Sequence, residues 1–341
     1  INDFNPAEEL AITNSRVDGL EARLNNFEAG SFSETTTASF GLDMYLGAFD
    51  DDDSKDDDSV MAGYSLGIGL NTSFTGEDSL DIAIDAGHSG EGVGEFDGNT
   101  NGDTLKVDGV SYTFPLGDKT TVIAGIDTDG SALFTTACAY AGPSNMLDDC
   151  ANVNAGITGG GATVGAAYDF GTGLTAAFGA QTKEDAVFTD ESLDSYALNA
   201  AYTADNYGVS ITYGVVENDA LTNEDTYTAF NAYYLPDGAG LPSVSVGYEL
   251  GDIGGAAATV DEKTSFMVGL SWDEVGPGSA GIALGHSSTL EGNDEAYQYE
   301  AYYSYPINDG MTITPLIYSK DNVTSDKDDS TGVMVKTSFS F

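Results

Sequence analysis

The sequence predicts an all-β fold: a transmembrane antiparallel β-barrel of about 16 strands, preceded by a short coiled-coil helix. Three observations predict it. From Ser31 onward, apolar side chains recur at every second position in one segment after another. The connections between these segments alternate between short and long, and the chain ends on an aromatic residue, Phe341. We therefore expect two parts, a helical linker at 1–30 and a barrel at 31–341.

The helix is expected over residues 6 to 29. Val17, Leu20, Leu24 and Phe27 follow one another at spacings of three and four, the a/d pattern of a short coiled coil. A stripe this short is not stable alone, so we expect it to pack against copies of itself or against the barrel rim.

The strands are expected where apolar residues alternate with Gly, Ser, Thr, Ala or Asn and turn residues bound the segment. Sixteen segments meet this description: 33–49, 59–75, 79–87, 103–116, 119–129, 161–171, 173–183, 194–204, 206–216, 224–235, 241–251, 262–273, 277–287, 295–306, 308–319 and 331–341.

The connections give the architecture. Short ones such as 76–78, 117–118 and 171–173 alternate with long ones such as 88–102 and 130–160. A barrel with tight turns at one rim and loops at the other shows this alternation, with both termini at the tight-turn rim. A β-sandwich has no reason to keep it through fifteen connections.

The last strand, 331–341, has two distinct faces. Val333, Val335, Phe339 and Phe341 fall on one side, and Lys336 lies with Met and Ser on the other. The last strand of a membrane barrel must pair with the first to close the sheet. The ending is similar to the C-terminal insertion signal of outer-membrane β-barrels, with Phe339 and Phe341 as its aromatic residues. On this stretch alone, an amphipathic strand of a β-sandwich is the alternative.

Composition limits the partners. The 341 residues include 10 Lys and Arg against 56 Asp and Glu, a net charge of −46. Such a chain attracts cations and does not bind nucleic acid by charge. No run of 18 apolar residues exists, so transmembrane helices are excluded.

The two cysteines, Cys138 and Cys150, lie twelve residues apart in one loop-like stretch without a neighbouring His. We predict a disulfide that staples the loop in an oxidising compartment. Two free thiols are the alternative.

The words ITNSRVDGLEARLNNFEAGSFSETTTAS, at 12–39, resemble the segment that joins helix to first strand in cyanobacterial outer-membrane porins. Those proteins are similar to the OprB carbohydrate-selective porin family. The resemblance implies a homotrimer in a Gram-negative-type outer membrane with both termini periplasmic. It also implies a surface-layer-homology domain upstream of Ile1 that grips a polymer linked to the peptidoglycan.

The longest connection, 130–160, is the third on its rim. In trimeric porins this loop folds into the barrel and forms the constriction, and the resemblance implies the same here. The disulfide ring would then present Asp148 and Asp149 to the lumen. A long surface loop stapled against proteolysis is the alternative.

The lumen is expected to be acidic, because the barrel from Ser31 onward contains eight Lys and no Arg. The positions opposite each strand's apolar set predict the pore-lining residues: Asp43, Asp81, Asp85, Asp127, Asp169, Lys183, Glu249, Glu300 and Lys336.

No motif supports catalysis, a cofactor or an ordered metal site. The acidic run at 50–58 lacks the spacing of a calcium-binding loop, so we predict at most loosely bound Ca²⁺ or Mg²⁺ at the outer loops. Two functions remain. The first is a passive channel for small hydrophilic solutes and ions that prefers cations. The second is a secreted or cell-surface acidic β-protein, an adhesin or calcium-binding layer protein.

Overall fold

The computed structural model describes residues 35–50, 60–88, 102–183, 187, 189, 193–219, 223–238, 240–254, 261–322 and 329–341. The predicted N-terminal helix, with Val17, Leu20, Leu24 and Phe27, and most of the acidic run at 50–58 lie outside these residues. No helix in the described ranges has the length and hydropathy needed to cross a membrane.

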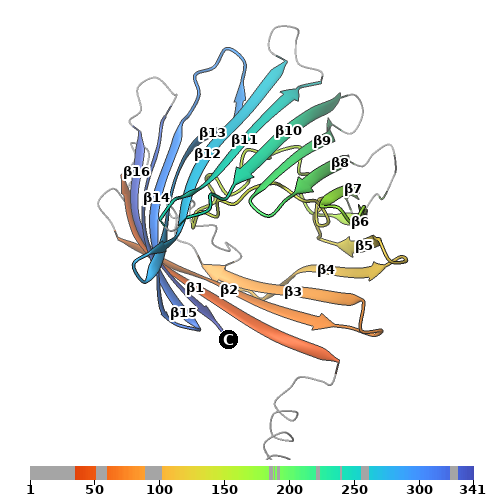
Figure 1. Ribbon diagram of the computed structural model, residues 1–341, viewed down its shortest axis with the longest axis horizontal. Helices are drawn as coiled ribbons and strands as arrows, with labels where there is room; N and C mark the ends of the chain where they lie inside the picture. The colour runs from red at the N-terminus through yellow and green to blue at the C-terminus, as the bar shows by residue number, and fades with distance from the viewer. Residues whose placement is uncertain are drawn as a thin grey trace, which may run out of the picture.

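The described chain contains sixteen strands, all antiparallel to their neighbours (Figure 1). They are β1 (Thr36–Asp50), β2 (Met61–Thr72), β3 (Ser79–His88), β4 (Lys106–Pro115), β5 (Thr120–Ile126), β6 (Ala162–Asp169), β7 (Leu174–Thr182), β8 (Asp194–Thr203), β9 (Tyr207–Asp219), β10 (Asn223–Tyr234), β11 (Ser243–Asp252), β12 (Glu262–Val275), β13 (Gly278–Leu290), β14 (Gln298–Asn308), β15 (Met311–Lys320) and β16 (Ser330–Ser340).

The sheet closes on itself. Each strand pairs with the next in the chain, and β1 pairs with β16. At this seam the Phe40 amide donates to the Phe341 carbonyl at 3.0 Å, the reverse bond measures 3.1 Å, and the two rings stack 5.7 Å apart. Closure leaves no unpaired strand edge. The predicted sixteen-stranded all-β barrel is confirmed.

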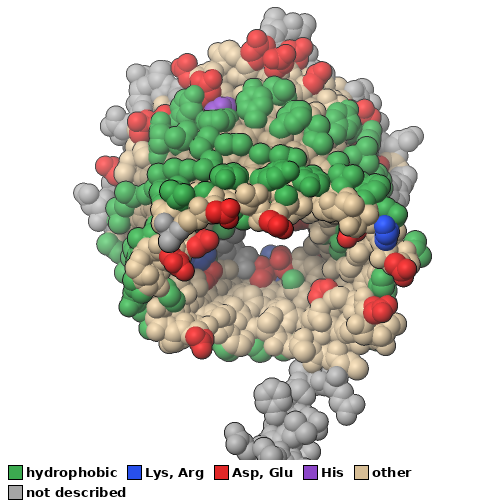
Figure 2. Space-filling view, viewed as in Figure 1, with side chains coloured by type: hydrophobic (Ala, Val, Ile, Leu, Met, Phe, Trp, Pro, Cys, Tyr) green, Lys and Arg blue, Asp and Glu red, His purple; other side chains and the backbone are tan. Residues whose placement is uncertain are grey.

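The two faces of the sheet differ in polarity, because successive side chains of a strand point to opposite faces. On β16, Val333 is 58% exposed on the outer face, whereas the neighbouring Met334 is buried inside. The same alternation places Leu198 and Ile317 outside, and Figure 2 shows the resulting belt of apolar side chains around the visible upper wall. The outer surface is therefore apolar although the chain as a whole is strongly acidic.

The two rims also differ. The tight-turn rim includes the turns at 73–78 and 170–173, where glycines with positive φ such as Gly76 and Gly171 allow the chain to reverse. The opposite rim carries the longer connections, including 127–161 between β5 and β6. The predicted alternation of short and long connections holds at most of the barrel. It fails at β10, where only residues 220–222 join β9 to β10 on the long-loop rim and residues 235–242 join β10 to β11 on the tight-turn rim.

Candidate functional site: the lumen and its internal loop

The connection between β5 and β6 runs along the inside of the barrel. Its amides donate to side chains that project inward from successive strands. The bonds are Gly130 N to Gln181 Oε1 (2.8 Å, β7), Thr135 N to Asn199 Oδ1 (3.0 Å, β8), Ala137 N to Ser210 Oγ (2.9 Å, β9) and Ala139 N to Ser245 Oγ (2.8 Å, β11). Because these four strands are neighbours or near neighbours, the loop follows the wall instead of projecting outward.

Glu300 on β14 anchors the middle of the loop. Its Oε1 accepts a 2.6 Å hydrogen bond from the Tyr140 hydroxyl, and its Oε2 accepts a bond from the Ser144 hydroxyl. Only 3% of Glu300 is exposed. A carboxylate this deeply buried needs such donors, since an unpaired buried charge is strongly unfavourable.

Glu249 on β11 anchors the returning arm of the loop. Its Oε2 accepts the Asn154 and Ala155 amides at 2.8 Å each, and its Oε1 accepts the Asn154 side chain at 2.6 Å. Only 1% of Glu249 is exposed. Two strand-borne carboxylates therefore hold two separate parts of the loop.

The loop also carries the disulfide and one side of an apolar core. Cys138 and Cys150 are bonded, which confirms the predicted pair, and their Cα atoms lie 6.4 Å apart. Tyr140, Met146 and Leu147 cluster with inward side chains of β1, β12, β13, β15 and β16. The principal hydrophobic core of the described chain thus lies inside the barrel, between loop and wall.

The predicted pore-lining residues divide into several groups. On the inner wall, Lys336 forms an ion pair with Asp43 at 3.2 Å and lies 5.8 Å from the centre of the Tyr45 ring. Asp85 faces inward on β3 opposite Lys106 of β4. These residues lie on the part of the wall that the internal loop does not cover.

Other predicted lumen residues lie at the barrel rims. Asp81, near the β2–β3 turn, accepts hydrogen bonds from Asn71 (2.6 Å) and Ser79 (2.5 Å). Asp169 ends β6 and accepts the Gly171 amide at 2.7 Å, which fixes the tight turn. Lys183 follows the last residue of β7 at the opposite rim and is exposed.

Two predictions require correction. Strand β5 ends at Ile126, three residues earlier than expected, and Asp127 adopts φ 50°. A residue in the left-handed conformation interrupts the alternation of side chains between the two faces. Counting positions along the strand therefore does not tell which way the Asp127 side chain points. Glu249 and Glu300 do face inward, but the loop covers them, and they bind the loop instead of lining the open passage.

The loop side chains that remain exposed include Asp148 and Asp149, on the stretch between the apolar contacts of Leu147 and the disulfide at Cys150. Figure 2 shows an opening through the molecule with acidic side chains gathered along its visible edge. The barrel thus encloses an opening edged by polar groups, and the internal loop lies along part of its inner wall.

Several residues that hold the loop were missed from sequence, among them Gln181, Asn199, Ser210 and Ser245. All four occupy inward positions of the period-two pattern. That pattern could have identified them as inward polar residues. It could not have shown that they contact a loop up to 106 residues away.

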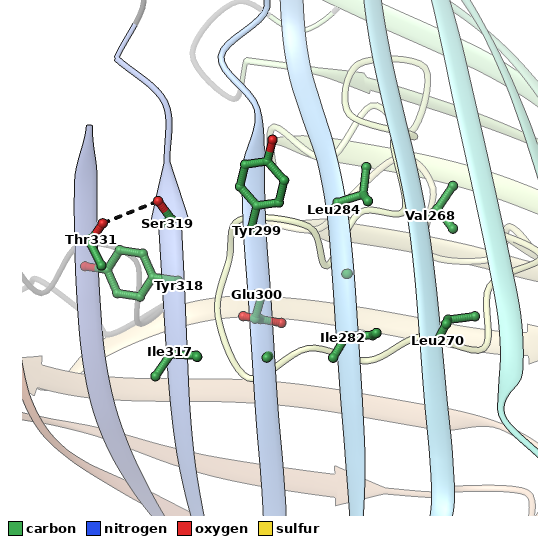
Figure 3. A pocket seen from close by; sticks show the side chains of 12 residues that line it. Val268, Leu270, Ile282, Leu284, Tyr299, Glu300, Ile317, Tyr318, Ser319 and Thr331 are labelled. Atoms are coloured by element: carbon green, nitrogen blue, oxygen red, sulfur yellow. Dashed lines mark hydrogen bonds between the residues drawn. The ribbon is translucent and has the colours of Figure 1, made fainter. Parts of the chain in front are cut away.

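The outer face of β12 to β16 carries a shallow apolar groove of about 460 Å³ (Figure 3). Val268, Leu270, Ile282, Leu284 and Ile317 line it, whereas Glu300 on the same wall directs its carboxylate to loop residues inside. One sheet therefore presents hydrocarbon on one side and hydrogen-bonding groups on the other.

Comparison with solved structures identifies porins as similar folds. The chain superposes on an anion-selective porin from Comamonas acidovorans (TM-score 0.64, 14% identity, 90% of this chain and 99% of that one). It also superposes on OprB of Pseudomonas putida (0.62, 10%, 90% and 94%) and on a mutant of the Rh. blastica porin (0.61, 14%, 90% and 100%). At these identities the likeness shows the fold.

Comparison with known sequences finds a relative but no matching family model. The chain is 26% identical over 407 residues to an uncharacterized protein of Nostoc sp., covering 98% of this chain and 70% of that protein. No protein-family model matches the chain. The chain thus has a closed sixteen-stranded barrel similar to those of porins.

Proposed function

We propose that this protein is a passive diffusion channel for small hydrophilic solutes and ions in the outer membrane of a Gram-negative-type bacterium. The observation that carries the proposal is the two-sided wall: a closed barrel with exposed apolar side chains outside and a polar passage inside. An outer belt with residues such as Val333 and Ile317 more than half exposed suits lipid and would be a liability in water. This favours the channel over a secreted acidic β-protein.

We propose further that the channel prefers cations. Fold alone does not decide ion preference, since an anion-selective porin has a similar barrel. Lumen charge does. The barrel region has eight Lys and no Arg, and one of these lysines, Lys336, is already paired with Asp43.

The assembly and location are part of the same proposal. We propose a homotrimer in a cyanobacterial-type outer membrane, in contact with lipid, with both termini periplasmic. The likeness to porins supports the outer membrane, and the Nostoc relative supports the cyanobacterial type. Attachment to a peptidoglycan-linked polymer through an upstream domain remains a prediction from the resemblance at residues 12–39. The proposal involves no enzymatic step and no cofactor, with Ca²⁺ or Mg²⁺ bound at most loosely at the outer loops.

Extraction and reconstitution test the channel. The protein should require detergent for extraction, keep its folded mobility on gels until boiled, and make liposomes permeable to small neutral sugars. A protein that is soluble in buffer as a monomer, or liposomes that stay impermeable despite correctly folded protein, would contradict the proposal.

The two loop acids test the ion preference. Replacing Asp148 and Asp149 with Asn should weaken the cation preference measured in a salt gradient, because both carboxylates are exposed on the internal loop. Replacing Asp118 and Asp205, exposed residues of the tight turns at 116–119 and 204–206, with Asn is the matched control for the loss of two charges. An unchanged preference in the loop variant would remove Asp148 and Asp149 from the ion path.

A further inference from the structure

Three groups of glycines on the inner face of the barrel differ in what covers them. In the first group each glycine lies directly opposite a tyrosine of the neighbouring strand, and the ring covers it. These pairs are Gly208 with Tyr233, Gly251 with Tyr227, Gly281 with Tyr302 and Gly332 with Tyr318. This group is explained by packing between adjacent strands.

The second group faces open space. Gly41 on β1 and Gly67 on β2 pair with each other, and a Cβ atom added to either would meet nothing within 4 Å. Neither has a positive φ, so an alanine could adopt the same backbone conformation. These two glycines lie on the wall that the loop leaves uncovered.

The third group lies under the internal loop: Gly179 on β7, Gly214 on β9, Gly247 on β11 and Gly269 on β12. We call these four the seat glycines. A Cβ at Gly214 would lie 2.9 Å from Ala155 Cα, and one at Gly269 would lie 2.6 Å from the Tyr140 ring. At Gly247 and Gly179 it would overlap the carbonyl oxygens of Cys150 and Gly130.

The seat glycines are not required by backbone conformation, because none of them has a positive φ. They are required because the internal loop lies too close to the wall for a larger side chain. Ordinary carbon–carbon contacts lie at about 3.5–4.0 Å, so even a methyl group at Gly214 would displace the loop backbone by about 1 Å. The fixed strands cannot yield as easily, since each is hydrogen-bonded on both sides.

The seat glycines contact the internal loop along its whole length. Gly130 at its start, Tyr140 and Cys150 in its middle and Ala155 in its returning arm each rest on one glycine. The contact at Cys150 is reinforced by a 2.7 Å hydrogen bond from the Asn231 side chain to the Cys150 carbonyl. Four contacts at separate points fix the depth of the loop along its length.

We propose that the seat glycines are positioning residues that set the distance of the loop from the wall, and therefore the width of the channel. This inference rests on the proposed function. A side chain at a seat position moves the loop toward the uncovered wall and narrows the passage. A side chain of the same size at Gly41 or Gly67 extends into open space and leaves the loop where it is.

The test compares two double variants that each add two methyl groups to the inner wall: Gly214→Ala with Gly247→Ala, and Gly41→Ala with Gly67→Ala. Single-channel conductance should fall about twofold in the seat variant and change little in the control. The permeability of liposomes to the largest admitted sugar should fall in parallel. Heat-modifiable gel mobility verifies that each variant is folded. If the double seat variant does not fold, the single variant Gly214→Ala is used for the same conductance measurement.

The outcomes separate the two proposals. A folded seat variant with the conductance and sugar permeability of the unmodified protein would overturn the inference. So would an equal fall in the seat variant and the control. An unmodified protein that forms no channel at all would instead overturn the proposed function.

Discussion

At the scale of single residues, Asp43 and Lys336 form an ion pair on the part of the lumen wall that the internal loop leaves uncovered. Both side chains are partly exposed, so the pair adds less than about 1 kcal/mol to stability. The pair matters more for the charge of the lumen, because the Asp43 carboxylate neutralises the Lys336 ammonium, which would otherwise face the passage.

Asp43→Asn should therefore reduce the cation preference of the channel while leaving its thermal stability nearly unchanged. The measurement is the reversal potential across a salt gradient. Asp43→Asn combined with Lys336→Gln is the matched control, since it removes both charges and should restore the original preference. Equal reversal potentials in the single variant and the unmodified protein would show that this pair lies outside the ion path.

Asp78 is the second informative residue, in the tight turn at 73–78. One of its oxygens accepts from the Phe74 and Thr75 amides and from two hydroxyls, and the other accepts the Tyr112 hydroxyl at 2.6 Å. These donors, led by Tyr112, hold the pKa of Asp78 well below its ordinary value despite its burial. A depressed folded-state pKa adds stability above the unfolded-state pKa, about 4, and that stability is lost as the pH falls toward the folded pKa.

Asp78→Asn should lower the melting temperature at neutral pH, and the difference from the unmodified protein should shrink as the pH falls below about 4. Thermal melts followed by circular dichroism across this pH range measure it. Glu77→Gln removes the same charge one residue away, at an exposed position, and should have little effect. A difference that stays constant from neutral to strongly acidic pH would show that ionised Asp78 is not what stabilises the turn.

At the scale of elements, the internal loop is held to the wall by amide hydrogen bonds, by two buried carboxylates and by apolar contacts, and it rests on the seat glycines. The disulfide closes a ring within the loop, so reducing it leaves these contacts with the wall in place. Removing Glu300 leaves the hydroxyls of Tyr140 and Ser144 buried without their acceptor, at a cost of about 1–3 kcal/mol each.

Glu300→Ala should therefore loosen the middle of the loop, most of all when a dithiol is present. Chymotrypsin, which cleaves after residues such as Tyr140 and Leu147, should then cut the loop, and single-channel currents should become noisier. Glu300→Gln keeps one acceptor oxygen and should give a smaller effect. Cleavage of reduced Glu300→Ala at the rate of the reduced unmodified protein would show that Glu300 does not hold the loop.

The sequence predicted those features of each element that depend on residues close to it in the chain. The two-residue period and the turn residues predicted the sixteen strands and most of the alternation between the rims, except on either side of β10. The two cysteines in one loop-like stretch predicted the bond between Cys138 and Cys150. The orientation of Glu300 also followed from parity. Its burial did not, because that depends on Tyr140, 160 residues away. The parity argument did not apply to Asp127, because β5 ends at Ile126 and Asp127 has a left-handed backbone conformation.

At the scale of the whole molecule, an outer belt of apolar side chains encloses a polar passage, and the chain carries a net charge of −46. The belt lies on the outer surface of the sheet, and acidic side chains such as Asp43 and Asp85 lie on its inner surface. In the proposed channel, lipid contacts the outer surface and ions encounter the inner one. Selectivity should therefore depend on ionic strength, because screening shortens the reach of lumen charges to about 10 Å at 0.1 M salt.

The most direct measurement is single-channel recording in a planar bilayer with a KCl gradient across it. The purified protein should open stable channels whose reversal potential has the sign of K⁺ preference, and the preference should decrease as the salt concentration rises. A reversal potential of the opposite sign would contradict the acidic lumen. Correctly folded protein that inserts and passes no current would contradict the channel itself.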